Sequence, residues 1–272
     1  MDISLTTLFF LLLASGFAGL VDSMAGGGGL IQLPALLVAL PDTETATVLG
    51  TNKLPSFLGT TTAATTYVRR RKPDWRLTCA MALPAFIGSM LGAAVASNFP
   101  KDAARPFILI LLIVVALYTW RRKELGLNEN LRFARQHTLL IALISGLAIG
   151  FYDGIFGPGT GAFLMVVLVA IIGMEFLDAT VTTKITNWGT NLAALLIFGF
   201  HGHIIWIIGL VMAISNVAGN QIGARLALRG GSGLVRRAFL GVTLILIIRL
   251  ARSEEHTSEL QSPMYLVCRL LL

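Results

Sequence analysis

Two aspartates and two lysines lie inside apolar stretches of this chain and recur at a fixed spacing. Asp22 recurs as Asp153 and Lys53 recurs as Lys184, each 131 residues later. An acid inside a membrane segment costs about 2.5–3.5 kcal/mol on insertion scales, so it needs a partner or a proton. A buried ammonium group likewise needs an anion. We expect each repeat to pair its own charges, Asp22 with Lys53 and Asp153 with Lys184.

Glycine-rich runs follow both aspartates. Asp22 is followed by Ser-Met-Ala and the run Gly26–Gly29, and Asp153 opens the run DGIFGPGTG, which ends at Gly161. Glycine runs break helices through their backbone entropy. A helix that starts after such a break directs its free backbone N–H groups toward the break, and its N-terminus carries about half a positive charge. We therefore predict one anion-binding half-site per repeat, the two facing each other. The alternative is that the glycines only permit close helix packing, although packing does not call for the acid.

Hydroxyl and amide side chains accompany the lysines, as Thr51 and Asn52 before Lys53 and Thr182 before Lys184 illustrate. The predicted substrate-binding residues are Gly26, Gly27, Gly28, Gly29, Asn52, Lys53, Gly157, Gly159, Thr160, Gly161, Lys184 and Asn187. The two aspartates are the candidates for proton coupling. The alternative is that each ion pair is structural and only fixes how the helices on either side of a glycine run pack against the rest of the protein. Removing one partner of such a pair costs about 3–5 kcal/mol, so variants would lose function without a role in binding.

Other repeated residues indicate packing and anchoring in a membrane. Glycines four residues apart make close-packing helix faces, and the two such pairs are Gly88/Gly92 and Gly219/Gly223. Trp75 and Trp206 open equivalent helices, as expected of the interfacial aromatic belt. The chain has no phosphate-binding loop, no Ser-His-Asp set and no Cys/His cluster. We therefore expect no ATP drive, no catalysis, no cofactor and no metal.

The composition predicts a membrane protein. Hydrophobic residues make up 55% of the chain and charged residues 13%, whereas a soluble domain carries about 25% charged residues. Apolar runs alternate with short polar loops, which is typical of multi-spanning helical proteins. The first 25 residues lack a basic start and a convincing cleavage site, so we interpret them as a membrane helix and not as a signal peptide. The net charge of +7 does not indicate nucleic-acid binding, because topology explains the basic loops.

Ten apolar segments are predicted, five in each repeat. The first repeat, residues 1–120, has segments at roughly 3–25, 30–41, 44–66, 76–97 and 105–120. The second repeat, residues 138–251, has segments at roughly 138–157, 161–175, 178–200, 204–228 and 235–250. Segment 30–41 is shorter than the roughly 20 residues of a full span, so it forms a hairpin with the first segment. The sequence does not decide whether each hairpin crosses the bilayer or enters it and returns on the same side. The predicted number of membrane helices is therefore eight to ten.

Basic loops predict that the two repeats are inverted relative to each other. Basic residues cluster after the third segment, in the linker 121–137 that joins the repeats, and after the fourth segment of the second repeat. They are Arg69, Arg70, Arg71, Lys72, Arg76, Arg121, Arg122, Lys123, Arg132, Arg135, Arg225, Arg229, Arg236 and Arg237. Because Lys and Arg are retained on the cytoplasmic side, only inversion puts all three clusters there. The predicted fold is an all-α polytopic membrane protein with two inverted-topology repeats and glycine-broken hairpins.

Residues 252–272 (RSEEHTSELQSPMYLVCRLLL) differ from everything before them. The run is polar, then mildly apolar, and it has no counterpart after the first repeat. It resembles the in-frame translation of a sequencing-library adapter joined to a truncated gene. We therefore expect a non-native tail and leave it out of the fold prediction. The alternative is a short natural tail.

Three motifs resemble those of the TauE/SafE family of sulfite exporters, within the wider group of 4-toluene-sulfonate-uptake-like permeases. They are Asp22–Pro34 (DSMAGGGGLIQLP), Gly50–Lys53 (GTNK) and Phe151–Gly161 (FYDGIFGPGTG). The likeness covers nearly all of residues 5–250. It implies a multi-pass permease of the bacterial inner membrane, driven by the proton-motive force, for small anions such as sulfite, sulfoacetate or sulfonates. The sulfur chemistry comes only from this resemblance.

The resemblance maps the glycine-rich loop of the family onto Gly26–Gly29 and Gly157–Gly161. The second copy departs from the pattern at Pro158 and Thr160, so the two half-sites are not equivalent. The predicted partners are a small anion and the lipid bilayer, with no nucleic acid. We hypothesise that the anion displaces an aspartate from its lysine and that the freed aspartate takes a proton. The alternatives are a passive anion channel and a membrane scaffold or accessory subunit whose charges are structural.

Overall fold

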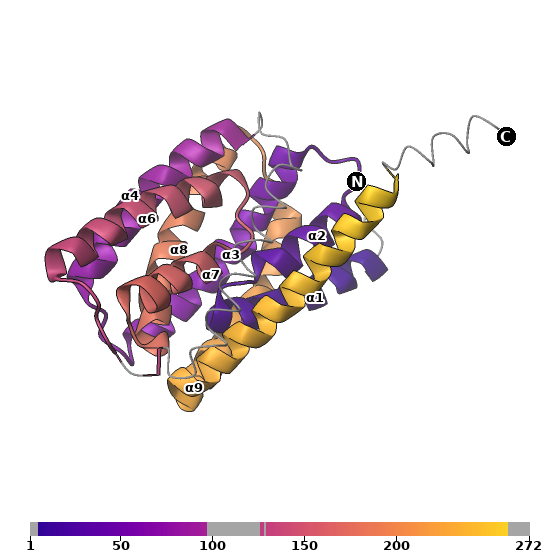
Figure 1. The fold of residues 1–272 in the computed structure, drawn as a ribbon. Helices are drawn as coiled ribbons and strands as arrows, with labels where there is room; N and C mark the ends of the chain where they lie inside the picture. Colours follow the sequence, from indigo (N-terminus) through magenta and orange to yellow (C-terminus); the bar gives the residue numbers. More distant parts are fainter. Residues whose placement is uncertain (1–4, 97–125, 128, 261–272) are drawn as a thin grey trace.

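The computed structural model describes residues 5–96, 126, 127 and 129–260. These residues form helices joined by short turns, with no strand among them, which confirms the all-α prediction (Figure 1). The helices are α1 (Leu5–Ala25), α2 (Gly29–Ala39), α3 (Thr45–Val68), α4 (Trp75–Val95), α6 (Arg135–Ile155), α7 (Thr160–Val166), the π-helical η3 (Val167–Ile172), α8 (Phe176–Phe200) and α9 (Trp206–Leu260). The predicted segment at 105–120 lies outside the described residues.

Both predicted hairpins are present, and a glycine with a positive φ angle ends the first helix of each. Gly26 has φ 75° and Gly157 has φ 82°, a left-handed conformation that an L side chain rarely adopts. After the breaks, α2 has 11 residues, and the α7–η3 unit ends at Ile172 because Gly173 turns left-handed at φ 97°. At about 1.5 Å per residue, each short helix falls well below the hydrocarbon core of about 30 Å.

Helices α3 and α8 lie side by side at the centre and run antiparallel (Figure 1). Near the start of α3, the Thr51 hydroxyl accepts a 2.9 Å hydrogen bond from the backbone N–H of Ile205, which follows α8. Just beyond the end of α3, Arg71 Nη1 lies 3.4 Å from Asp178 Oδ1 in the first turn of α8. The start of one helix therefore meets the end of the other, and their middle turns meet inside the protein.

Glycine faces bring the outer helices into backbone contact, as predicted for Gly88/Gly92 and Gly219/Gly223. A Cβ atom on Gly88 would lie 2.8 Å from the backbone nitrogen of Phe151 in α6. On Gly219 it would lie 2.9 Å from the backbone nitrogen of Leu20 in α1. Helix α4 thus packs on α6, and α9 packs on α1 in the same way. Each contact joins a helix of the first repeat to one of the second.

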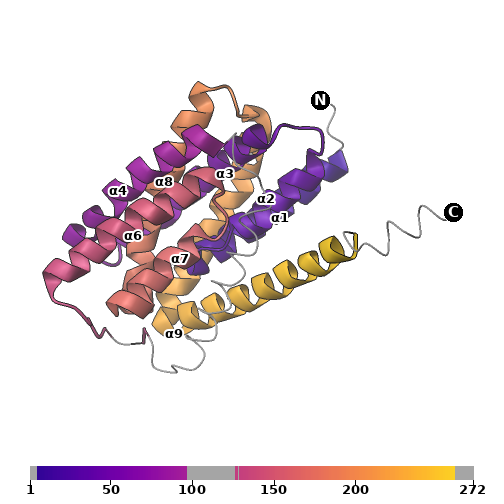
Figure 2. The same cartoon turned by 45° about the horizontal axis from the view of Figure 1, so that its top comes forward.

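Helix α9 includes two predicted segments in one helical run. The run is interrupted at Gly231, which has φ 62° and ψ −168°, between the predicted segments 204–228 and 235–250. Beyond this break the helix runs along the outside of the bundle, and residues 252–260 of the expected tail continue it (Figure 2).

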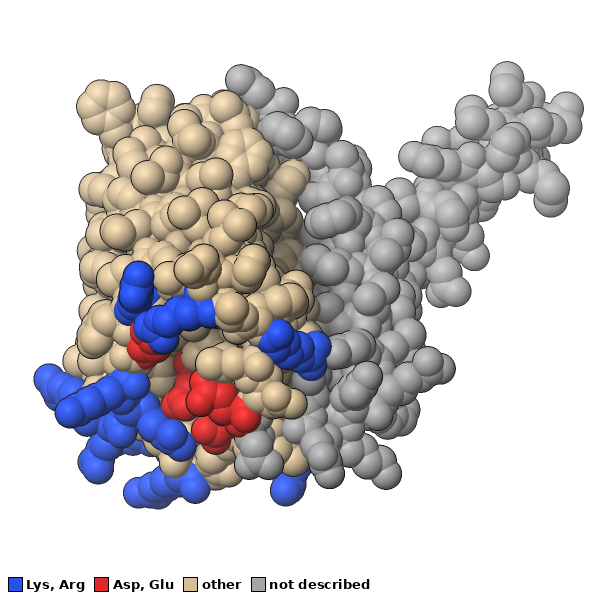
Figure 3. Space-filling view, turned by 60° about the vertical axis from the view of Figure 1, so that its left-hand side comes forward, with Lys and Arg blue, Asp and Glu red and all other residues tan. Residues whose placement is uncertain are grey.

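The described surface suits a membrane. Four helices are long and apolar enough to cross one, within α1, α4, α6 and α9. Large apolar side chains such as Phe9, Phe17, Leu83 and Ile144 are exposed on their outer faces. Charged side chains of the described residues on the face drawn in Figure 3 gather at one end, and the rest of the described part of that face carries none. The chain is therefore an integral membrane protein with several helices in the bilayer.

We expect Gly88→Ala to lower the stability of the purified protein by about 1–3 kcal/mol, because the added methyl group forces α4 away from α6. Gly233→Ala is the matched control, since a Cβ there meets no atom of the described residues within 4 Å and alanine favours the helix. Thermal unfolding in detergent measures both. Equal melting temperatures for the two variants would contradict the close contact.

Candidate functional site

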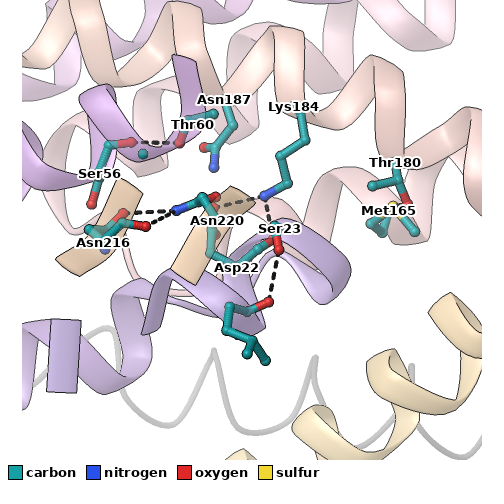
Figure 4. Close-up of polar contacts among 12 residues, drawn as sticks. Asp22, Ser23, Ser56, Thr60, Met165, Thr180, Lys184, Asn187, Asn216 and Asn220 are labelled. Atoms are coloured by element: carbon teal, nitrogen blue, oxygen red, sulfur yellow. Dashed lines mark hydrogen bonds and ion pairs between the residues drawn. The ribbon is translucent and has the colours of Figure 1, made fainter. Parts of the chain in front are cut away.

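The buried lysines pair with the aspartates of the other repeat, so the predicted pairing within each repeat is wrong. Lys53 Nζ lies 2.8 Å from Asp153 Oδ2, and Lys184 Nζ lies 2.8 Å from Asp22 Oδ2 (Figure 4). The side chains of Lys53, Asp153 and Lys184 are at most 3% exposed. The repeat spacing identifies equivalent positions, but it does not say which copy of the hairpin each lysine faces.

Each lysine also binds the end of the helix that carries its aspartate. Lys53 Nζ donates to the backbone oxygen of Asp153 at 2.8 Å, and Lys184 Nζ donates to the backbone oxygen of Asp22. These carbonyls belong to the last turns of α6 and α1, where the helix dipole is negative. A carboxylate and a helix C-terminus together compensate each buried ammonium group.

The two hairpin breaks meet backbone to backbone. A Cβ on Gly26 would lie 2.8 Å from the backbone nitrogen of Ala162, and one on Gly161 would lie 3.0 Å from the carbonyl carbon of Gly26. Gly29 faces Pro158 of the opposite break, with 3.3 Å between its Cβ position and the Cα of the proline. The glycines thus allow the two hairpins to touch, and the helices α2 and α7 start next to this contact.

A small cavity lies between the ion pairs and the breaks. Its lining residues are Asp22, Gly26, Gly29, Asn52, Lys53, Ser56, Asp153, Gly157, Thr160, Gly161, Asn187 and Asn191. Its volume is about 20 Å³, just above the roughly 10–15 Å³ that one water needs. Of the residues predicted from sequence, Gly27, Gly28, Gly159 and Lys184 do not line it. Lys184 reaches its edge through the bond to Asp22, and Gly28 packs against Asp22 Cβ.

Sequence reasoning missed Ser56 and Asn191, although a signal for them was present. Ser56 precedes Asn187 by 131 residues, and Thr60 precedes Asn191 by the same number. These positions follow each lysine by three and seven residues, so they share its helix face. Figure 4 shows Ser56 and Thr60 together on α3, and the Thr60 hydroxyl donates to the Ser56 carbonyl at 2.6 Å. A duplicated polar stripe therefore runs along α3 and α8.

A buried amide network holds Asn52 against the cavity. Gln32 Nε2 donates to Asn52 Oδ1 at 2.8 Å. Gln32 Oε1 in turn accepts from Asn216 Nδ2 at 2.7 Å and from the Ser15 hydroxyl at 3.1 Å. The second repeat has Phe163 at the position equivalent to Gln32, and it is part of the hydrophobic core. This network therefore exists on one side of the site, and it gives the two half-sites different polarity.

The two aspartates also differ in their surroundings. The Thr160 hydroxyl donates to Asp153 Oδ1 at 2.7 Å, so Asp153 binds both a lysine and a hydroxyl group. The first repeat has Gly29 at the equivalent position, which offers no hydroxyl. The Asp22 side chain is 15% exposed and the Asp153 side chain 2%. Of the two acids, Asp22 is therefore the more exposed, and it lacks the additional hydroxyl bond that Asp153 accepts.

The described residues contain no group of three or more His, Cys, Asp or Glu that could hold a metal ion. The cavity is lined by the ammonium group of Lys53, the carboxylates of Asp22 and Asp153, amide and hydroxyl side chains, and the starts of two helices, with Lys184 at its edge. Apart from the two carboxylates, which the lysines compensate, these groups favour an anion.

Comparison with known proteins identifies the family. The profile described as "Sulfite exporter TauE/SafE" matches residues 11–250. The chain belongs to the TauE/SafE family. A "Probable membrane transporter protein ORF9" of Sinorhizobium sp is 38% identical over 94% of this chain and 96% of its own length. The "Probable membrane transporter protein YfcA" of Escherichia coli K12 is 36% identical over 90% and 89%. No solved structure matches the chain significantly.

The match to the TauE/SafE family begins within α1 and ends within α9, so it includes both hairpin breaks and both central helices. A relative from Haemophilus influenzae, also described as a "Probable membrane transporter protein", is 33% identical over 87% of this chain. The resemblance stated from the three motifs is confirmed.

We expect Lys53→Met to destabilise the protein by about 3–5 kcal/mol, because it leaves Asp153 buried without its partner. Adding Asp153→Leu should recover most of the loss. Adding Asp22→Leu instead should lower stability further, since Lys184 then loses its partner too. Thermal stability followed by size-exclusion chromatography separates the two double variants. Recovery by Asp22→Leu would contradict the exchanged pairing.

Proposed function

We propose that this TauE/SafE protein is a secondary transporter of a small, singly charged oxyanion, sulfur-containing like sulfite or an organosulfonate. We further propose that it resides in the bacterial inner membrane and couples transport to protons. The observation that carries the proposal is the pair of exchanged Lys–Asp contacts on either side of a cavity between two helix breaks. The family description and the names of the relatives support transport, and the name of the family suggests the sulfur oxyanion.

The two repeats are proposed to have inverted topology. The antiparallel course of α3 and α8, which occupy equivalent places in the repeats, supports inversion. The helix contacts between the repeats also support inversion, because α1 of the first repeat packs on α9 of the second, and α6 of the second packs on α4 of the first. The short α2 and α7–η3 helices favour hairpins that enter the bilayer and return on the same side. A substrate site where two such repeats meet is the arrangement used by many secondary transporters.

Charge balance explains why an anion would travel with a proton. Two lysines and two aspartates together carry no net charge. An entering monoanion adds one negative charge to a water-poor site, which is costly unless it is compensated. Protonation of one aspartate removes a negative charge and frees its lysine to bind the anion. Anion and proton binding then favour each other by linkage.

Asp22 is the aspartate proposed to take the proton. It holds one ion pair with Lys184, whereas Asp153 also binds the Thr160 hydroxyl. Its side chain is the more exposed of the two. The cavity of about 20 Å³ is too small for an oxyanion of four or more heavy atoms. Loading therefore requires the hairpins to separate, and Lys184 is the lysine that protonated Asp22 would release.

Two alternatives make different predictions. A passive channel would conduct the anion without concentrating it. A scaffold would bind no anion in the cavity, so sulfite or a sulfonate would not raise its melting temperature, whereas a ligand that binds the native state does.

Proteoliposomes with an imposed pH gradient test the coupling. We expect the protein to accumulate a monovalent sulfonate about tenfold per pH unit, as one proton per anion requires. Asp22→Asn should abolish accumulation, because asparagine cannot take a proton, while downhill flux of the anion persists. Glu44→Gln is the matched control, since Glu44 lies outside the cavity and its side chain is 63% exposed. Size-exclusion chromatography verifies that each variant is folded.

Unaltered accumulation in Asp22→Asn would remove Asp22 from the mechanism. Flux without accumulation in the unmodified protein would favour the channel, and absence of both flux and ligand-induced stabilisation would favour the scaffold.

Cysteine labelling tests the inversion. Lys72 and His201 lie in equivalent loops, after α3 and after α8, and both are exposed. With Cys79 and Cys268 replaced by alanine, a membrane-impermeant maleimide should label His201→Cys in intact cells. Lys72→Cys should react only after lysis, because its loop carries the basic cluster retained in the cytoplasm. Labelling of both, or protection of both, would indicate parallel repeats.

A further inference from the structure

A second, larger pocket lies at the end of the protein where the basic side chains gather (Figure 3). It is formed by the end of α3, the start of α8 and the break in α9. Its lining residues are Thr66, Arg69, Arg70, Arg71, Leu177, Gln221, Arg225, Leu228, Arg229, Gly230 and Gly231. Its volume is about 860 Å³. It shares no lining residue with the central cavity, so it is a separate feature of the molecule.

The charges of this basic pocket are not balanced by the described side chains. Arg71 lies 3.4 Å from Asp178 and 3.9 Å from Glu175. The other four arginines make no ion pair with any residue that the structure describes; they are Arg69, Arg70, Arg225 and Arg229. Four guanidinium groups around one hollow repel each other unless an anion lies between them.

Contacts between the helices hold the walls of the basic pocket in place. The Thr66 hydroxyl donates to Gln221 Oε1 at 3.3 Å and joins α3 to α9. The Ser232 hydroxyl accepts from the backbone N–H of Leu177 at 3.1 Å and ties the break in α9 to the start of α8. The pocket is therefore part of the packed structure, not a chance gathering of surface arginines.

The lining indicates what kind of ligand would bind. A guanidinium group offers a planar fork of N–H donors that matches the oxygens of phosphate and sulfonate groups. Leu177 and Leu228 add an apolar surface beside the arginines. At the break, a Cβ on Gly231 would meet no described atom within 4 Å, so the backbone there is open to close approach by a ligand.

We propose that the basic pocket is a second binding site, for a phosphate- or sulfonate-type oxyanion, separate from the central cavity. The group comes either from a soluble anion or from the headgroup of an anionic lipid, since both present the same oxygens. The inference goes beyond transport, because it needs neither the cavity nor the buried ion pairs.

The test compares Arg225→Gln/Arg229→Gln with the control Lys72→Gln/Arg76→Gln. Both variants remove two positive charges, and the control residues are exposed, lie at the same end and do not line the pocket. Inorganic phosphate is titrated calorimetrically into full-length, delipidated protein. Phosphatidylglycerol binding is counted by native mass spectrometry, with phosphatidylcholine as the reference lipid.

We expect the pocket variant to lose about tenfold or more in affinity for one of the two probes, while the control stays within about twofold of the unmodified protein. The affected probe identifies the source of the anion. Arg69→Gln/Arg70→Gln, on the opposite wall, should show the same loss and serves if the first variant does not fold. Equal binding by the pocket variant and the control overturns the proposal, as does absence of binding of either probe to the unmodified protein.

Discussion

The exchange of ion pairs between the repeats is the interaction on which the rest of the site depends. Each repeat contributes a lysine and an aspartate, and neither is compensated by its own half of the chain. Because uncompensated charges in an apolar interior are costly, the charges favour only arrangements in which the hairpin of one half docks against the central helix of the other. The antiparallel α3 and α8, the touching glycine breaks and the small cavity between them are all consistent with this single requirement.

The two halves are related in sequence, but their surroundings have diverged. In the first half, Asn52 is bound by Gln32, which in turn binds Ser15 and, from α9 of the second half, Asn216. The second half has an aromatic core residue, Phe163, at the position equivalent to Gln32. Thr160 binds Asp153, and glycine stands at the matching place beside Asp22. These asymmetric polar contacts are the reason for proposing Asp22, and not Asp153, as the acid that takes the proton.

Local signals in the sequence located most of the described helices and most of the residues that line the candidate cavity. Glycine runs identified the hairpin breaks, and glycines four apart identified the faces along which α4 meets α6 and α9 meets α1. The pairing of Lys53 could not be obtained this way, because it depends on which of the two hairpins each central helix faces, and a repeat spacing does not encode that. Ser56 and Asn191 were missed because a single serine or asparagine in a helix is a weak signal. The two positions stand out only when the two repeats are aligned.

The exchanged contacts also have an evolutionary consequence. Lys53 binds Asp153, which is the equivalent of Asp22 in the second repeat. Asp22 in turn binds Lys184, which is the equivalent of Lys53. This reciprocity is what an isologous interface produces, in which the same patch on two identical subunits binds itself. A gene of half this length would encode a chain able to satisfy its buried charges by self-association, provided that its copies entered the bilayer in opposite orientations. Fusion of two such genes would have fixed those orientations and freed each copy to change on its own.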